Sequence, residues 1–133
     1  MMLRMMTPKM ISSEPDAMAP DGSEVRILAR TDRGSMAQFT LPAGKISVAV
    51  AHRTVEEVWF FVSGRGQFWR KNDEGDEIIP IVAGLSISIA VGTHFQFRND
   101  STEPLVAIGT TMPPWPGLDE AYTVDGKWVP TAI

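Results

Sequence analysis

Cysteine is absent from the 133-residue sequence, and its absence excludes several kinds of chemistry. Without a thiol the protein has no cysteine nucleophile, no thiolate metal ligand and no disulfide framework. Because no disulfide can form, the stability of the fold must come from packing. Histidine is also scarce, with two in the whole chain.

An excess of positive charge is lacking as well. The chain has 12 Lys and Arg residues against 16 Asp and Glu residues, a formal net charge of −4, and its basic residues form no stripe. Such a chain is unlike the proteins that neutralise a phosphate backbone. No apolar run reaches the roughly 20 residues of a membrane span, and none resembles a signal peptide. We expect a cytoplasmic protein with neither nucleic acid nor membrane as a partner.

Helical periodicity is missing from the centre of the sequence. Between Val25 and Met112 no stretch of helix length has apolar residues at the spacing of an amphipathic helix. Instead, short runs of strand formers alternate with turn residues, and Leu85 to Ala90 shows the period of two of a half-buried strand. The predicted strands span residues 25–29, 36–41, 46–51, 55–63, 67–70, 77–82, 85–90, 95–98 and 105–111. This pattern predicts an all-β antiparallel sandwich or barrel in a single domain.

The two ends of the chain differ from this central region. Residues 1–24 contain three prolines and little periodicity, so we expect an N-terminal arm before a barrel of residues 25–112. Residues 113–133 begin with three prolines around Trp115, which remove backbone donors and predict a tail packed on the barrel. Three interpretations of residues 112–117 stay open: a lid over the barrel mouth, a subunit contact, or packing alone.

One ionisable cluster precedes a run of aromatic and β-branched residues. It consists of His52, Glu56 and Glu57, and nowhere else does a histidine have two carboxylates within a few residues. A histidine and a carboxylate can act as general acid and base when burial shifts their pKa values towards neutrality. His52 and Glu57 are therefore the candidate catalytic residues. The simpler interpretation of His52 is a structural histidine hydrogen-bonded to a carboxylate.

The spacing around this cluster resembles the two sequence motifs of the cupins. Glu57 is followed by six residues and then Gly64, as in the second half of the first motif, and Gly44 stands at the front of the same block. The second motif matches in register at Gly84, Gly92 and Asn99. The resemblance implies a small single-domain cupin with a double-stranded β-helix, or jelly-roll, barrel. Small cupin barrels often pair through outer strands, so we expect a homodimer.

The departures from these motifs concern the metal ligands. In cupins two histidines and a glutamate of the first motif, with a histidine of the second, are the usual ligands. In register, His52 and Glu57 hold two of these positions, whereas Val50 and Phe95 hold the other two. His94 is one residue from the expected place and would point inward only through a β-bulge. The motifs thus imply His52 and Glu57, with His94 as an optional third ligand, only if a divalent metal is present; no cofactor is firmly predicted.

Strand alternation predicts the interior of the barrel. If Glu57 points inward, Trp59 and Phe61 do so too, while Glu56 and Val58 face the other way. The expected pocket has mainly apolar walls with two polar groups, the usual form of a small-molecule site. Its predicted lining is Val50, His52, Glu57, Trp59, Phe61, Phe95 and Phe97.

These observations leave three hypotheses for function. The first is a small cupin that binds a small organic molecule through His52 and Glu57, with the ligand unidentified. The second is a metal-dependent cupin enzyme of the dioxygenase or isomerase type. The third is a non-catalytic interaction protein whose aromatic side chains fill the barrel, in which case no cavity reaches His52 and Glu57. The sequence does not decide whether the protein is an enzyme.

Overall fold

The computed structural model describes residues 7–117 and 119–132. Within these residues the chain forms eleven β-strands and no helix. No helix long and apolar enough to cross a membrane is present in this part of the chain. In chain order the strands are β1 (Ala17–Met18), β2 (Glu24–Arg30), β3 (Ser35–Leu41), β4 (Val50–His52), β5 (Glu56–Ser63), β6 (Gly66–Asn72), β7 (Gly75–Ile81), β8 (Ser86–Ile89), β9 (His94–Asn99), β10 (Leu105–Met112) and β11 (Ala121–Thr123).

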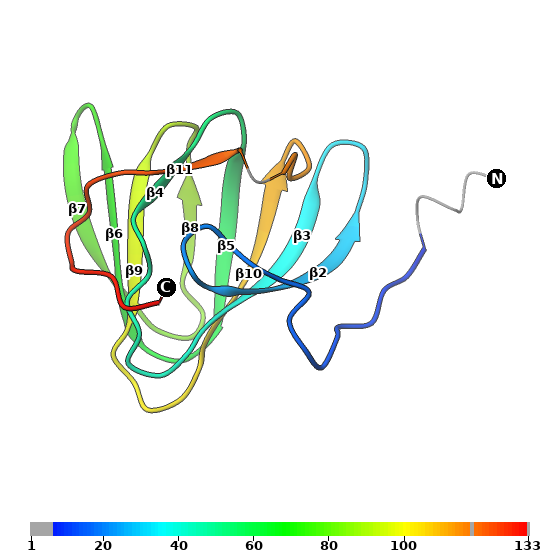
Figure 1. Cartoon of the computed structure of the whole chain (residues 1–133), viewed down its shortest axis with the longest axis horizontal. Coiled ribbons are helices and arrows are strands. Elements are labelled where there is room, and N and C mark those ends of the chain that lie inside the picture. The colour runs from blue at the N-terminus through cyan, green and yellow to red at the C-terminus, as the bar shows by residue number, and fades with distance from the viewer. Residues whose placement is uncertain (1–6, 118, 133) are drawn as a thin grey trace.

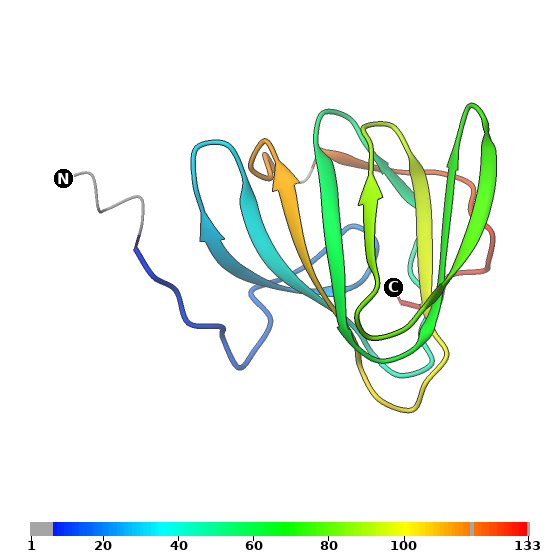
Figure 2. The same cartoon turned by 180° about the vertical axis from the view of Figure 1, so that it is seen from behind.

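The strands form two antiparallel sheets. The first has the order β1-β2-β3-β10-β5-β8, and the second the order β11-β4-β9-β6-β7. Figures 1 and 2 show β2 and β3 at one end of the molecule and β6 and β7 at the other. The all-β prediction is confirmed, and all nine predicted strands are present with ends shifted by a few residues. The two additional strands, β1 and β11, come from the N-terminal and C-terminal segments.

One predicted strand is shorter than expected. The pattern of residues 46–51 predicts a continuous strand, but β4 begins only at Val50. Before it, the backbone hydrogen-bonds to segments from both chain ends: Val48 N donates to Asp21 O, and Ile46 O accepts from Thr131 N and Ala132 N. Buried backbone groups need a partner, and here the arm and the tail supply it in place of a regular strand.

The core follows the alternation of β5. Along this strand Glu57, Trp59 and Phe61 are at most 3% exposed, whereas Val58 and Phe60 are each 48% exposed. The inward rings pack against Phe68, Phe95 and Phe97 of the second sheet, with Phe68 stacked on both phenylalanines of β9. Burial of rings of this size dominates the energetics of a core. The aromatic cluster therefore holds the two sheets together.

The outer face of β5 remains apolar. Val58, Phe60 and Val62 are each 48% exposed and lie on one face of the strand. The expected homodimer stays a prediction, because the structure contains a single chain.

Gln96 fixes the C-terminal tail to the outside of the second sheet. Its side chain is fully buried on the face of β9 opposite Phe95. Nε2 donates to the carbonyl oxygens of Ser47 and Trp128, and Oε1 accepts from the amides of Lys127 and Trp128. One amide side chain thus satisfies four backbone groups.

We predict that Gln96→Ala releases this tail. Four backbone groups lose their partner, so the free energy of unfolding should fall by about 1–3 kcal/mol in urea titrations. Limited proteolysis should cut the variant between residues 124 and 132 before it cuts the barrel. Gln67→Ala, on the neighbouring strand β6, is the matched control and should stay close to wild type. Equal protease resistance of the two variants would contradict the assignment.

Candidate functional site

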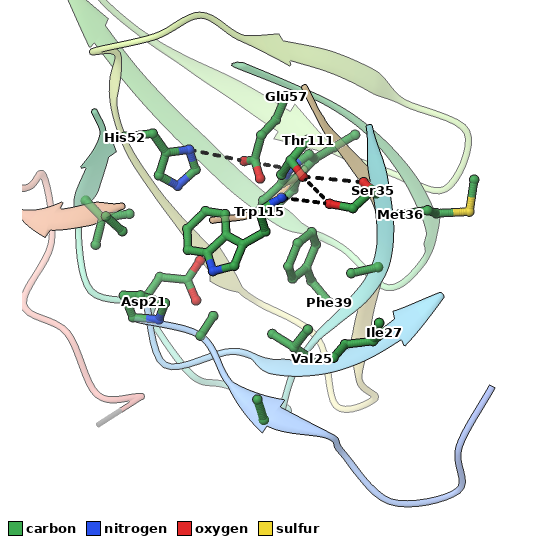
Figure 3. A pocket seen from close by; sticks show the side chains of 18 of the residues that line it. Asp21, Val25, Ile27, Ser35, Met36, Phe39, His52, Glu57, Thr111 and Trp115 are labelled. Atoms are coloured by element: carbon green, nitrogen blue, oxygen red, sulfur yellow. Dashed lines mark hydrogen bonds and ion pairs between the residues drawn. The ribbon is translucent and has the colours of Figure 1, made fainter. Parts of the chain in front are cut away.

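A cavity of about 250 Å³ lies at the mouth of the barrel. Its walls come from both sheets, from the arm and from the tail, as Figure 3 shows. The aromatic part of its lining is Phe39, Trp59, Phe95 and Trp115, and the acidic part is Asp21 and Glu57. A largely apolar cavity with a few polar groups is the usual setting for a small organic ligand.

His52 and Glu57 form the polar pair inside this cavity. His52 is 5% exposed and Glu57 is 3% exposed. His52 Nδ1 lies 3.7 Å from Glu57 Oε2, too far for a hydrogen bond. Glu57 Oε2 accepts a hydrogen bond of 3.1 Å from Trp59 Nε1, whereas His52 Nδ1 has no hydrogen-bond partner within the described residues. The two groups therefore face each other without completing a direct contact.

Burial makes both members of the pair neutral near pH 7. Desolvation raises the pKa of Glu57 to about 8, against the lowering effect of the Trp59 hydrogen bond. Desolvation also lowers the pKa of His52 to about 4, although nearby Glu120 favours its protonated form. A protonated glutamic acid and a neutral imidazole do not form an ion pair. The pair thus offers one hydrogen-bond donor from the carboxyl group and one free acceptor or donor from the ring.

Asp21 is a second buried carboxyl group in the lining. It is 5% exposed, and its Oδ1 accepts hydrogen bonds from the amide and the hydroxyl of Ser23. Desolvation raises its pKa despite these two hydrogen bonds. The wall formed by the arm is therefore acidic, but poorly suited to carry a charge.

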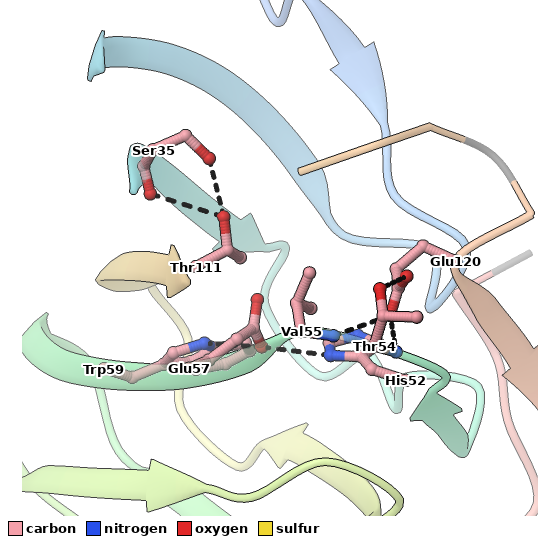
Figure 4. A network of polar contacts seen from close by, with 8 residues as sticks. All are labelled: Ser35, His52, Thr54, Val55, Glu57, Trp59, Thr111 and Glu120. Carbon is pink, nitrogen blue, oxygen red and sulfur yellow. Dashed lines mark hydrogen bonds and ion pairs between the residues drawn. The ribbon is translucent and has the colours of Figure 1, made fainter. Parts of the chain in front are cut away.

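The C-terminal tail positions His52. Ala121 of β11 pairs directly with His52 of β4, and the Trp115 ring lies edge-on to the imidazole at 5.2 Å. Next to this contact, Glu120 accepts hydrogen bonds from both Thr54 and the Val55 amide, as Figure 4 shows. Burial alone would raise the pKa of Glu120, but these hydrogen bonds lower it, so the side chain is a carboxylate.

A further polar pair in the lining, Ser35 and Thr111, has its hydrogen bonds completed within the protein. Ser35 Oγ lies 2.6 Å from Thr111 Oγ1 and accepts a hydrogen bond of 3.0 Å from the Trp115 amide. Thr111 also faces the carbonyl oxygen of Ser35. These hydroxyls connect β3, β10 and the tail. They leave the His52–Glu57 pair as the incomplete polar group of the cavity.

The chain resembles known proteins both in sequence and in its arrangement of strands. No protein-family model matches the chain. An uncharacterised protein of Methanocaldococcus jannaschii is 28% identical over 120 residues, covering 84% of this chain and 93% of that protein. Among solved structures, an uncharacterised protein with a double-stranded β-helix domain from Klebsiella pneumoniae superposes with a TM-score of 0.69 at 13% identity, covering 90% of this chain and 100% of the other. Oxalate decarboxylase of Bacillus subtilis superposes with a TM-score of 0.66 at 17% identity, covering 84% of this chain but 30% of the enzyme.

The chain has the cupin fold. At these sequence identities the similarity establishes the double-stranded β-helix and leaves activity open. The expected fold class is therefore confirmed.

All four cupin ligand positions line the cavity. Val50 and His52 come from β4, Glu57 from β5 and Phe95 from β9, and Val50 pairs directly with Phe95 across the two strands. Two of the four side chains are hydrocarbon and cannot coordinate a metal. Within residues 7–117 and 119–132, no group of three His, Cys, Asp or Glu side chains is arranged to hold a metal ion. The usual cupin donor set therefore does not fit this chain.

His94 does not complete the set. The interpretation that a bulge could turn it inward is wrong, because β9 pairs with β6 in unbroken register from His94 to Asn99. Alternation then places His94 on the same face as Gln96, opposite the cavity-lining Phe95. His94 therefore lies on the face of its sheet that is turned away from the cavity lined by His52 and Glu57.

The predicted lining agrees with the cavity in part. Val50, His52, Glu57, Trp59 and Phe95 line it. Phe61 and Phe97 do not: they are at most 2% exposed and pack with Phe68 deeper in the barrel. Alternation gave their direction correctly, but rings that fill the barrel cross-section leave space only near its mouth.

Several lining residues were missed in the sequence. Thr111 could have been found by extending the period of two along β10, where Leu105, Ala107, Gly109 and Thr111 are buried in turn. Phe39 stacks on Trp59 with ring centroids 4.8 Å apart. Both rings pass so close to Gly109 that a Cβ atom there would lie 2.6 Å from Phe39. The arm residue Asp21 and the tail residue Trp115 carry no local signal of their position.

We predict that Glu57→Gln changes the pH dependence of stability. In the unfolded chain Glu57 ionises near pH 4.5, but in the folded protein it keeps its proton up to about pH 8. The folded state binds more protons between these values, so its stability falls as pH rises through this window. Glutamine does not ionise, so the variant should not show this loss in the free energy of unfolding, which is on the order of a few kcal/mol by pH 8.

Urea unfolding of both proteins at several pH values measures this effect. His52 has the opposite slope, because its lowered pKa makes stability rise with pH between about 4 and 6.5, but it is present in both proteins. Glu56→Gln, at the exposed neighbouring position, should follow wild type. Parallel curves for wild type and Glu57→Gln would show that Glu57 is not held protonated.

Proposed function

We propose that the protein binds a small organic molecule in the cavity at the barrel mouth, with His52 and Glu57 as its polar groups. The observation that supports this most directly is the cavity of about 250 Å³ that reaches both residues. An apolar cavity of roughly 150 Å³ is large enough to take up benzene, so one substituted ring fits here. The filled-barrel hypothesis expected no such cavity.

The side chains at the four usual cupin ligand positions favour binding over metal-assisted chemistry. Relatives of the same fold include oxalate decarboxylase of Bacillus subtilis, a protein with Mn(II) centres. In this chain Val50 and Phe95 replace two of the four usual ligands. Catalysis by His52 and Glu57 as acid and base stays compatible with the site, because one is a neutral base and the other a protonated acid.

Binding is tested with a substitution that fills the cavity. Ala37 lines the cavity, so Ala37→Phe should occupy the space of a ligand. In ligand-observed NMR we expect toluene to bind wild type and the affinity for it to fall by about tenfold or more in Ala37→Phe. Ala43→Phe, at an exposed turn, is the matched control and should bind like wild type. Equal binding by all three proteins would show that toluene binds elsewhere.

The metal-enzyme alternative is tested by elemental analysis of the purified protein. We expect no stoichiometric manganese, iron, nickel or zinc, since the chain supplies two donors where catalytic sites usually have three protein ligands. Growth in medium supplemented with each metal should not change this result. A stoichiometric metal that is lost in His52→Ala would instead support the metal-dependent enzyme.

A further inference from the structure

One polar atom in the cavity lacks a partner although the protein surrounds it. Among the described residues, His52 Nδ1 is the buried side-chain nitrogen or oxygen for which no hydrogen bond is found. It faces Glu57 Oε2 across 3.7 Å. Buried polar groups are nearly always hydrogen-bonded, and an exception calls for a partner that the protein itself does not provide.

The two atoms are too close for a third atom to fit between them, so a bridging oxygen lies to one side of the line that joins them. An oxygen at about 2.8 Å from both Nδ1 and Oε2 forms two ordinary hydrogen bonds. A ring nitrogen of histidine can accept a hydrogen bond, and the carboxyl group of a glutamic acid can donate one. A hydroxyl group does both at once, as it is one donor and an acceptor.

The acidic groups around the cavity disfavour an anionic ligand. Asp21 and Glu57 are in the lining, and the Glu120 carboxylate lies close behind His52. The basic residue of the lining, Arg30, is exposed at the end of β2. A cation would need Glu57 to ionise in a desolvated position. An uncharged ligand needs neither change.

We propose that the bound molecule is a small uncharged alcohol or phenol whose hydroxyl bridges His52 and Glu57. Its apolar body, no larger than one substituted ring, lies against the aromatic side chains of the cavity. This inference rests on the proposed function and specifies the ligand class of the same site. The Ser35–Thr111 pair does not compete for the hydroxyl, because its hydrogen bonds are satisfied within the protein.

The test compares four probes of similar size on the full chain: benzyl alcohol, ethylbenzene, benzylamine and benzoate. Dissociation constants are measured by NMR titration near pH 7. We expect benzyl alcohol to bind about tenfold more tightly than ethylbenzene and than either charged probe. The comparison is stringent, because an apolar cavity without the bridge would favour ethylbenzene, the more apolar of the two.

Variants separate the bridge from the cavity. His52→Phe and Glu57→Leu should each reduce the preference for benzyl alcohol to below about threefold while ethylbenzene affinity is retained, which also shows that the variants fold. Glu57→Gln should keep most of the preference, because its amide still donates. Glu56→Leu, on the outer face of β5, is the control and should bind both probes like wild type.

The outcomes are distinguishable. If ethylbenzene binds as tightly as benzyl alcohol, the hydroxyl bridge is wrong and the proposed binding function stands. If benzylamine or benzoate binds most tightly, the site takes a charged ligand and the inference is equally wrong. If none of the four probes binds and Ala37→Phe changes nothing, the proposed function fails together with the inference.

Discussion

The packing of Trp59 is the interaction on which the rest of the structure depends. Its indole stacks on Phe39 of the first sheet and meets the rings of Phe95 and Phe97 of the second sheet edge to face. The same side chain donates its N–H to Glu57. Trp59 thus joins the two sheets and orients the carboxyl group of Glu57. It also lies between the filled part of the barrel and the cavity. Aromatic pairs of this geometry contribute stability beyond the area they bury.

This aromatic setting determines the electrostatics of the site. Cupin metal centres place a cation beside the glutamate, but here the neighbouring positions are hydrocarbon. Desolvation in this aromatic setting raises the pKa of Glu57 to about 8, so its carboxyl group keeps its proton near pH 7. Val50 and Phe95, at two of the four usual cupin ligand positions, add hydrocarbon instead of donor atoms to the surroundings of His52 and Glu57.

Local patterns were sufficient for the strands and for the direction of each side chain on β5. They were sufficient because a period of two is set by backbone geometry and needs no knowledge of neighbours. The depth of Phe61 and Phe97 could not be predicted in this way, since depth depends on how rings from both sheets fill one cross-section. Asp21 and Trp115 were missed for a related reason. They reach the cavity through the path of the arm and the tail, which hydrophobic periodicity does not encode.

The N-terminal arm and the C-terminal tail form part of the cavity wall. Residues 17–21 of the arm cover one side of it, and β1 is held to β2 by two residue pairs. Trp115 covers another side from a proline-rich segment that lies outside any strand. Hydrogen bonds add to this pairing: the Val48 amide donates to Asp21 O, the Ile27 amide to Asp16 Oδ2, and the Trp115 amide to Ser35 Oγ. Because these segments lie outside the aromatic packing between the two sheets, the cavity can be uncovered without separating the sheets.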